Sequence, residues 1–364
     1  MSLRSSYAGS TDAKLDEIAI RLATEADAST WDAYLDRVPM SSPLSRYAWL
    51  NVLNYGYDVR TLGFIAEGAS GAIVGLLPAY VVSDFRHQRW LYSLKFGLVA
   101  DSDEVARQLM VSLREYCAEH RIIRGLTHAG YSELHIPFTQ IRKNTLTLEL
   151  GDSEEAQWAS LRSKTRNMIR KAGRNDLVAE RGFHNLREFY EIYCNEMLRM
   201  RLAVHPYRFF QGIAEHLADE SELIVAKHRD QAIAGILVVF AKDVATYPFN
   251  VSLRQYHQYA PNPLLIWEAV EACLERRVSL LDMGESNEGS SVYQFKKNFG
   301  GTPRDVFYYV TETPLARNGV DLGSVRSLLV GVPLSRAARI LSTTGPERVR
   351  RRISPWVKSK GRIL

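Results

Sequence analysis

Two stretches of alternating apolar and polar residues repeat along the chain, each broken by a short polar turn. Residues 65–77 align without a gap on residues 225–237, and identical residue types recur at a constant offset from Ala66, Ala72, Ile73, Gly75 and Leu77. Alternation of this kind, interrupted by a tight turn, is typical of an antiparallel β-hairpin. The pattern therefore predicts two copies of one hairpin, with chance similarity as the alternative.

The segments before the two hairpins strengthen the repeat. Apolar residues at helical spacing predict amphipathic helices at 28–35 and 47–53 before the first hairpin, and at 186–200 and 209–217 before the second. A length of 364 residues also exceeds the size at which a single core stops growing. We therefore predict two domains of the same fold.

The second copy continues with further elements of both kinds. Its pattern predicts a strand at 244–250, a helix from Leu264, a strand at 278–283, a short helix ending at Gly300 and Gly301, and a strand at 305–311. This order is typical of an α/β (α+β) fold in which helices flank a mixed sheet. In the first copy, residues 105–119 read as a helix and residues 145–150 as a strand, which places the boundary near Gly151.

The predicted organisation has four parts. They are a disordered N-terminus at 1–15, a first domain at 16–150, a second domain at 151–312 and a basic C-terminal tail at 313–364. Within the tail, residues 328–341 predict short helices interrupted at Pro333. Residues 348–364 are rich in Lys and Arg.

Composition narrows the class of protein. Cys117, Cys194 and Cys273 are far apart and form no CxxC pair, which argues against a disulfide framework and against a thiolate zinc site. The first ten residues lack the apolar segment of a signal peptide, and no apolar run approaches the roughly 18 to 20 residues of a membrane span. These features predict a cytoplasmic protein, and no group of residues has the ligand spacing of a metal site.

The excess of positive charge, +5 overall, is concentrated in two places. Arg162, Arg166, Arg170 and Arg174 recur at four-residue spacing, so a helix would carry them as one cationic row. A phosphate-bearing partner would relieve their repulsion: tRNA, a nucleotide-sugar diphosphate or an anionic lipid surface. The alternative is neutralisation by acids of the chain, such as Glu154, Glu155 or Glu180. The basic tail suits peripheral contact with the inner membrane surface, with a solvated terminus as its alternative.

Residues 261–301 combine a helix start, a strand, two acids and a lysine pair in one unit. Lys296 is the first candidate for catalysis, because a fixed cation can stabilise an oxyanion that develops during a reaction at a carbonyl group. Asp282 and Glu285 follow the strand and are candidates to accept a proton from an attacking amine. The alternatives are structural: a solvated helix face for Lys296 and Lys297, and turn or cap formation for the acids.

These motifs, in this order, resemble the FemAB family, and within it the branch associated with exopolysaccharide loci. The resemblance covers about the last two thirds of the chain and rests on three blocks. They are Arg254, Tyr256, Pro261, Asn262, Leu264, Leu265, Trp267, Glu268, Asp282, Gly284, Phe295, Lys296, Phe299 and Gly300; the block 161–172 with Phe189, Tyr190 and Met197; and the tail 332–346. It implies two tandem GNAT-like domains (the acyl-CoA N-acyltransferase fold) and transfer of acyl or aminoacyl groups to an envelope precursor.

The resemblance also implies binding roles. It places Phe295 and Lys296 at the active site and Tyr247 in the substrate channel. It makes Asn262 a candidate ligand of the substrate and Arg166 and Arg170 candidate phosphate ligands. His205, Tyr207 and Arg208 are expected in a loop between helices that contacts the acceptor.

Two departures from the family pattern bear on the substrates. The loop that holds pyrophosphate in acetyl-CoA enzymes here reads Gln-Tyr-Ala-Pro-Asn-Pro at 258–263, and proline removes amide donors. Acetyl-CoA is thereby disfavoured, while other acyl carriers stay open, and the expected donor is an aminoacyl-tRNA or an acyl-CoA. Residues 95–98 read Lys-Phe-Gly-Leu in place of a Tyr-Gly-Gly turn, which leaves the acceptor open between a sugar-nucleotide and a lipid-linked precursor.

The sequence thus predicts an acyltransferase or aminoacyltransferase that acts on an amine or hydroxyl of a precursor of exopolysaccharide or peptidoglycan. The alternative is a non-catalytic protein that keeps the GNAT fold to recognise a glycan precursor.

Overall fold

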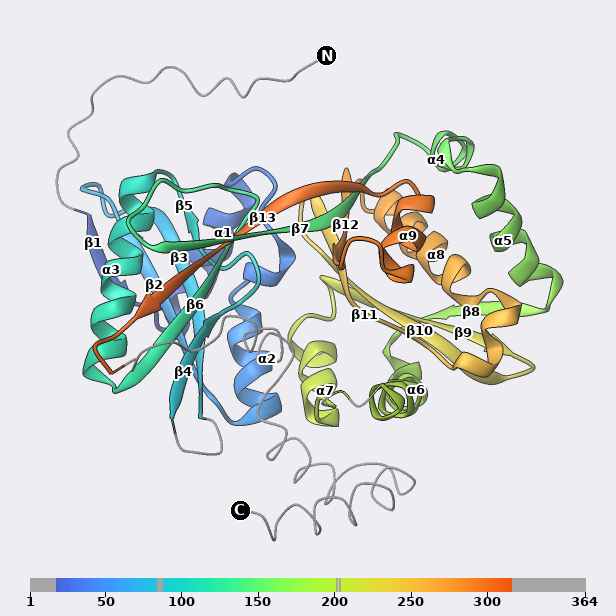
Figure 1. Cartoon of the computed structure of the whole chain (residues 1–364), viewed down its shortest axis with the longest axis horizontal. Coiled ribbons are helices and arrows are strands. Elements are labelled where there is room, and N and C mark those ends of the chain that lie inside the picture. The colour runs from blue at the N-terminus through green and yellow to red at the C-terminus, as the bar shows by residue number, and fades with distance from the viewer. Residues whose placement is uncertain (1–17, 84–87, 201, 203, 316–364) are drawn as a thin grey trace, which may run out of the picture.

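The computed structural model describes residues 18–83, 88–200, 202 and 204–315, arranged as two halves joined by a continuous sheet (Figure 1). The predictions for residues 1–15 and 328–341, and nearly all of the basic tail, lie outside the described residues. Within them, no helix has both the length and the apolar character needed to cross a membrane.

The first half runs to the end of β7. Its main elements are β1 (Ala19–Leu22), α1 (Ala28–Arg37), α2 (Ala48–Tyr57), β2 (Arg60–Glu67), β3 (Ile73–Ser83), β4 (Arg89–Ser93), β5 (Val99–Ala100), α3 (Asp103–Glu119), β6 (Ile122–Gly130) and β7 (Thr139–Glu149). The first predicted hairpin is confirmed as β2 and β3, which pair antiparallel, and the three predicted helices are confirmed as α1, α2 and α3.

The second half repeats the order of helices followed by a hairpin. Its main elements are α4 (Glu154–Ser160), α5 (Ser163–Arg174), β8 (Leu177–Arg181), α6 (Leu186–Arg199), α7 (Tyr207–His216), β9 (Ser221–His228), β10 (Gln231–Phe240), β11 (Val244–Ser252), α8 (Pro261–Glu275), β12 (Leu280–Glu285), α9 (Ser291–Asn298) and β13 (Thr302–Glu312). The second hairpin is confirmed as β9 and β10.

The described strands form one mixed sheet in the order β1-β2-β3-β4-β6-β13-β7-β12-β11-β10-β9-β8, with β5 on the side of β3. The pairs β4–β6 and β11–β12 are parallel, and the other pairs are antiparallel. Helices cover the sheet, as predicted from the order of elements.

Strand exchange joins the two halves. β13, predicted as the last strand of the second copy, pairs with β6 and β7 of the first half, whereas β7 also pairs with β12 of the second (Figure 1). Placing β13 within the second copy's own sheet was therefore wrong, because local patterning does not choose a strand's partner. The domain division near Gly151 stays a prediction.

Helices α2 and α7 form a second link between the halves. A Cβ built at Gly56 of α2 would lie 2.7 Å from the Cα of Phe209 in α7, so only glycine allows this approach. Apolar side chains from both halves then share one buried cluster that includes Val52, Phe209 and Leu237. This packing sets the wall of the cavity described next.

Candidate active site

A cavity of about 770 Å³ lies between the two halves. The second half contributes residues of β11, β12, α7, the start of α8 and α9, and the first half contributes residues of α2, the β4–β5 loop, β6 and β7. The predicted residues that line it are His205, Tyr247, Asn262, Asp282, Glu285, Phe295 and Lys296. The fold therefore brings most of the sequence-predicted site together.

Lys296 is buried in α9, with 6% of its surface exposed. Ser290 caps the start of this short helix by accepting a hydrogen bond from the Tyr293 amide. Tyr293 and Lys296 are three residues apart, so they lie on the same, buried face of the helix. The Lys296 ammonium donates to the carbonyl oxygen of Gly284 and to the Ser286 hydroxyl, both at 2.8 Å. Burial lowers the pKa of Lys296 to about 8. A solvated helix face is therefore excluded for this lysine.

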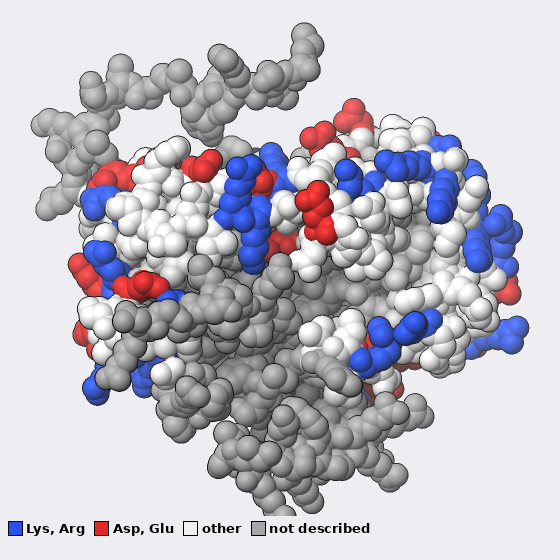
Figure 2. All heavy atoms as spheres, in the orientation of Figure 1, with Lys and Arg blue, Asp and Glu red and all other residues white. Residues whose placement is uncertain are grey.

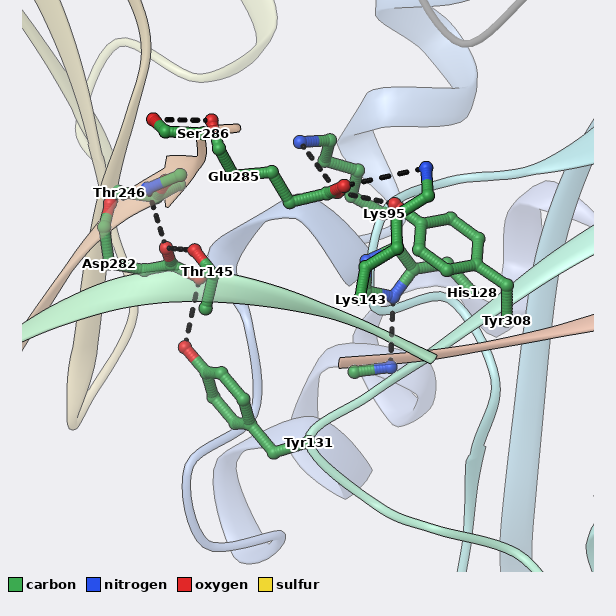
Figure 3. Close-up of polar contacts among 12 residues, drawn as sticks. Lys95, His128, Tyr131, Lys143, Thr145, Thr246, Asp282, Glu285, Ser286 and Tyr308 are labelled. Atoms are coloured by element: carbon green, nitrogen blue, oxygen red, sulfur yellow. Dashed lines mark hydrogen bonds and ion pairs between the residues drawn. The ribbon is translucent and has the colours of Figure 1, made fainter. Parts of the chain in front are cut away.

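Asp282 is also buried, and protein donors occupy its carboxylate. Its Oδ1 accepts hydrogen bonds from the Thr145 hydroxyl at 2.6 Å and from the backbone amide of Gly284 at 2.7 Å, and its Oδ2 accepts from the Tyr131 hydroxyl at 2.9 Å (Figure 3). A carboxylate held in this way is poorly placed to take a proton from a substrate.

Glu285 is the more accessible of the two acids, and groups from other strands surround it. The Tyr308 hydroxyl donates to Oε1, and the ammonium groups of Lys95 and Lys143 each lie 3.6 Å from a carboxylate oxygen (Figure 3). The carboxylate side chain keeps 23% of its surface exposed and lines the cavity. It can therefore meet a ligand.

His128 is a buried, neutral imidazole beside this cluster. The backbone amide of Gly130 donates to its Nδ1 at 2.9 Å, so Nε2 carries the proton in the neutral ring. Burial, with Lys95 and Lys143 nearby, holds the pKa of His128 well below its ordinary value. At neutral pH this side chain is therefore a hydrogen-bond donor and not a cation.

A second part of the cavity is aromatic. The Tyr57 hydroxyl contacts His205 Nδ1, and the His205 ring stacks on Phe209 with 4.8 Å between centroids. Burial lowers the pKa of His205 to about 4, so its ring is neutral. Phe249, on the strand that carries Tyr247, closes this part. The surroundings favour an uncharged group of the ligand.

Asn262 lies at the second position of α8, between two prolines. Proline at the first position suits the start of a helix, but both prolines lack the amide that an anion would need. Ala260 precedes them in a left-handed conformation, with φ of 64°. This end of α8 offers fewer donors than an ordinary helix start.

Known proteins are similar to this chain in sequence or fold. Residues 159–297 match the family described as the acetyltransferase (GNAT) domain. The structure is similar to that of FemX, with a TM-score of 0.61, 14% identity, and coverage of 79% of this chain and 96% of FemX. It is also similar to a tandem GNAT protein from the clavulanic acid biosynthesis pathway, with a TM-score of 0.54, 13% identity and coverage of 81% and 98%.

The chain has the GNAT fold. A third similar structure, the C-terminal domain of a putative lysylphosphatidylglycerol synthetase from Agrobacterium fabrum, has a TM-score of 0.51 and 11% identity, with coverage of 88% of this chain and 98% of that domain. None of the curated proteins compared with the chain matches its sequence.

The match to the GNAT domain contains the predicted catalytic residues but leaves out several neighbours. Lys95, His128, Lys143 and Thr145 precede the matched segment, and Tyr308 follows it. Sequence reasoning singled out the turn at 95–98 but gave Lys95 no role, and it missed the others because no local motif surrounds them. These residues lie near the end of β12 because β13 and β7 stand between β6 and β12 in the sheet and bring the two halves together.

Four predicted residues lie away from this GNAT cavity. Tyr207 and Arg208 form the first turn of α7, so placing them in a loop was wrong; Tyr207 packs on Tyr190 and Arg208 lies over the Tyr55 ring. Arg166 and Arg170 lie on α5 and do not line the cavity.

The cationic row on α5 is only partly available to a partner. The Arg166 guanidinium donates to the carbonyls of Trp158 and Ala159 at 3.3 and 3.0 Å, and Arg170 lies over the Trp158 ring. Glu180, one expected neutralising acid, pairs with Lys227 at 2.8 Å. Figure 2 shows Lys and Arg side chains following α5 along the edge of the molecule. In the described ranges no acid forms an ion pair with the row.

The described residues contain no group of three or more His, Cys, Asp or Glu side chains able to hold a metal ion.

Proposed function

We propose that the protein is an acyltransferase or aminoacyltransferase that modifies an amine or hydroxyl of a cell-envelope precursor. The buried Lys296 ammonium in the cavity between the halves carries this proposal. Acyl transfer builds negative charge on the carbonyl oxygen of the donor, and a cation held in a dry site stabilises that charge far better than one in water.

The chemistry assigns a role to each charged group. The acceptor nitrogen or oxygen attacks the donor carbonyl, and the Lys296 ammonium stabilises the resulting oxyanion. The new bond keeps the acyl group on the acceptor, while the bond to the donor's oxygen or sulfur breaks. Glu285, the carboxylate open to the cavity, takes the proton from the attacking group, and the leaving group receives it.

Three observations bear on the donor, and together they favour an aminoacyl-tRNA over an acyl-CoA, whose pyrophosphate is the same whatever the acyl group. The prolines at 261 and 263 remove amides from the helix start that would hold a pyrophosphate. The cations on α5 suit a phosphate backbone outside the cavity. The neutral aromatic part around His205 suits an apolar side chain of the transferred group or of the acceptor.

The acceptor class rests on the resemblance to the FemAB family and on the fold shared with FemX. We propose a sugar-nucleotide or lipid-linked precursor of exopolysaccharide or peptidoglycan. A cytoplasmic site of action, with peripheral contact to the inner membrane surface, fits such a precursor.

The donor test compares total aminoacyl-tRNA with acetyl-CoA and octanoyl-CoA, using UDP-linked amino sugars and UDP-linked muropeptides as acceptors. Mass spectrometry should detect an acylated acceptor with aminoacyl-tRNA as the donor and little product with either acyl-CoA. If tRNA is the donor, Arg170→Glu on α5 should lower the rate more at 150 mM salt than Arg187→Glu on α6, because only the first lies in the proposed phosphate row. Absence of product from every pairing would contradict the proposal.

The rate of transfer should depend on the charge of Lys296. Because its pKa is about 8, the ammonium is lost as pH rises through 8, and kcat/KM should then fall about tenfold per pH unit. A pH series with a hydroxyl acceptor, whose own protonation is constant, measures this limb. Lys296→Arg keeps a cation and should abolish the limb. A rate that is flat between pH 7 and 10 would contradict the role of the ammonium.

A further inference from the structure

Asp282 and Lys296 are joined through one residue, Gly284. The Gly284 amide donates to Asp282 Oδ1 at 2.7 Å, and the Gly284 carbonyl accepts from the Lys296 ammonium at 2.8 Å. Gly284 has a φ of 80°, in the left-handed region that favours glycine. The pairing of β12 with β7 also shifts register here, between Asp282 and Glu285. This bulge turns the Gly284 carbonyl toward the ammonium.

Asp282 is itself anchored from the first half of the fold. Tyr131, just after β6, and Thr145, on β7, donate to its two carboxylate oxygens, while Thr246 on β11 donates to its backbone carbonyl at 3.0 Å (Figure 3). Only 3% of Asp282 is exposed. Three donors thus occupy most of the acceptor capacity of the carboxylate, although Asp282 lines the cavity close to the reacting region.

We propose that Asp282 is a positioning residue, which aims the Lys296 ammonium through the Gly284 peptide and balances its charge inside the cavity. The inference rests on the proposed function, in which that ammonium stabilises the oxyanion. Asp282 thereby links the contact between the two halves to the position of the Lys296 ammonium, because its hydrogen-bond donors come from both halves.

The charges around Lys296 support this role. Asp282 and Glu285 face it from β12, and Lys95 faces it from the β4–β5 loop. Tyr247 on β11 stays neutral, because burial raises its pKa. Burial has the largest effect and lowers the pKa of Lys296, while Asp282 is the larger of the two carboxylate influences that raise it. Removing the Asp282 charge should therefore lower that pKa further.

The test is a double-mutant cycle of Asp282→Asn and Lys296→Met, measured as the free energy of unfolding in urea from pH 6 to 10.5. A lysine whose folded pKa lies below its unfolded value costs stability while it is charged, and this cost disappears as pH rises from the folded toward the unfolded pKa. The difference in the free energy of unfolding between the wild type and Lys296→Met should therefore begin to change near pH 8. In the Asp282→Asn background, the change should begin about one pH unit lower.

The coupling between the two positions should also depend on pH. At pH 6 it should correspond to about a tenfold change in the folding equilibrium, and it should shrink as pH rises through 8, where the ammonium of the folded protein is lost. Glu285→Gln is the matched control, since it removes the other acid of β12. It should displace the pH at which the stability difference begins to change by less than Asp282→Asn does. Coupling that is absent, or constant across the pH range, would overturn the proposal.

Two further measurements separate the possible failures. If Lys296→Met transfers acyl groups at the wild-type rate, the proposed function fails, whatever the coupling in the stability cycle. If Asp282→Asn does not fold, Tyr131→Phe removes one anchor of the carboxylate and keeps its charge. It should then lower kcat several-fold without moving the alkaline limb of the pH profile. An unchanged kcat would overturn the positioning role.

Discussion

Lys296→Met is expected to lower kcat for acyl transfer by about 10²–10³-fold, the usual loss when one group that stabilises an oxyanion is removed. The fold should survive the change. Methionine has a similar length, and the lowered pKa of Lys296 means that its charge costs stability in the folded protein, which offsets the loss of its partners. Steady-state kinetics and urea unfolding on the same preparation measure both effects.

Lys297→Met is the matched control, because Lys297 is adjacent in α9 but lies over the Tyr293 ring and does not line the cavity. It should change kcat by less than about threefold, as expected for a group that meets neither substrate nor reacting atoms. A wild-type rate for Lys296→Met, or equal losses for the two variants, would remove Lys296 from the mechanism.

Phe209→Ala is expected to lower the free energy of unfolding by about 3–5 kcal/mol, the range for deleting a buried aromatic ring. Phe209 is 5% exposed and lies where α7 meets α2. Its ring centroid lies 4.8 Å from that of His205 and 5.3 Å from that of Tyr57. The lost ring would therefore loosen the contact between the halves and the aromatic part of the cavity together. Thermal and urea unfolding measure the loss.

Phe209→Leu should recover more than half of that stability, because it refills most of the volume. Phe138→Ala provides a comparison in the first half alone, where the ring is only half-buried beside the core, and it should cost less. If Phe209→Ala unfolded at the wild-type urea concentration, the link between α2 and α7 would contribute little to the fold.

Because the site combines residues from distant parts of the chain, neither half completes it alone. Lys296, Glu285 and Asp282 come from the second half. Lys95, Tyr131 and Thr145 come from the first half, and Tyr308 reaches Glu285 from β13, which is embedded between β6 and β7. The first half thereby supplies the groups that hold the acids of β12.

The sequence by itself determined the local structure and the core of the site. Alternation and helical spacing predicted both hairpins and the helices that precede them, because these patterns depend on which face of each element is buried. The order of motifs between residues 261 and 301 likewise predicted the residues now seen on one wall of the cavity.

Only the tertiary structure decided which strands pair and which side chains surround the acids of β12. It paired β13 with β6, placed Lys95 and Lys143 beside Glu285, and surrounded Asp282 with Thr145 and Tyr131. It also tied Arg166 to the carbonyls at the end of α4 and moved Tyr207 into a helix. Strand partners and charge environments depend on contacts between residues far apart in the chain, and no local pattern of apolar and polar positions specifies those contacts.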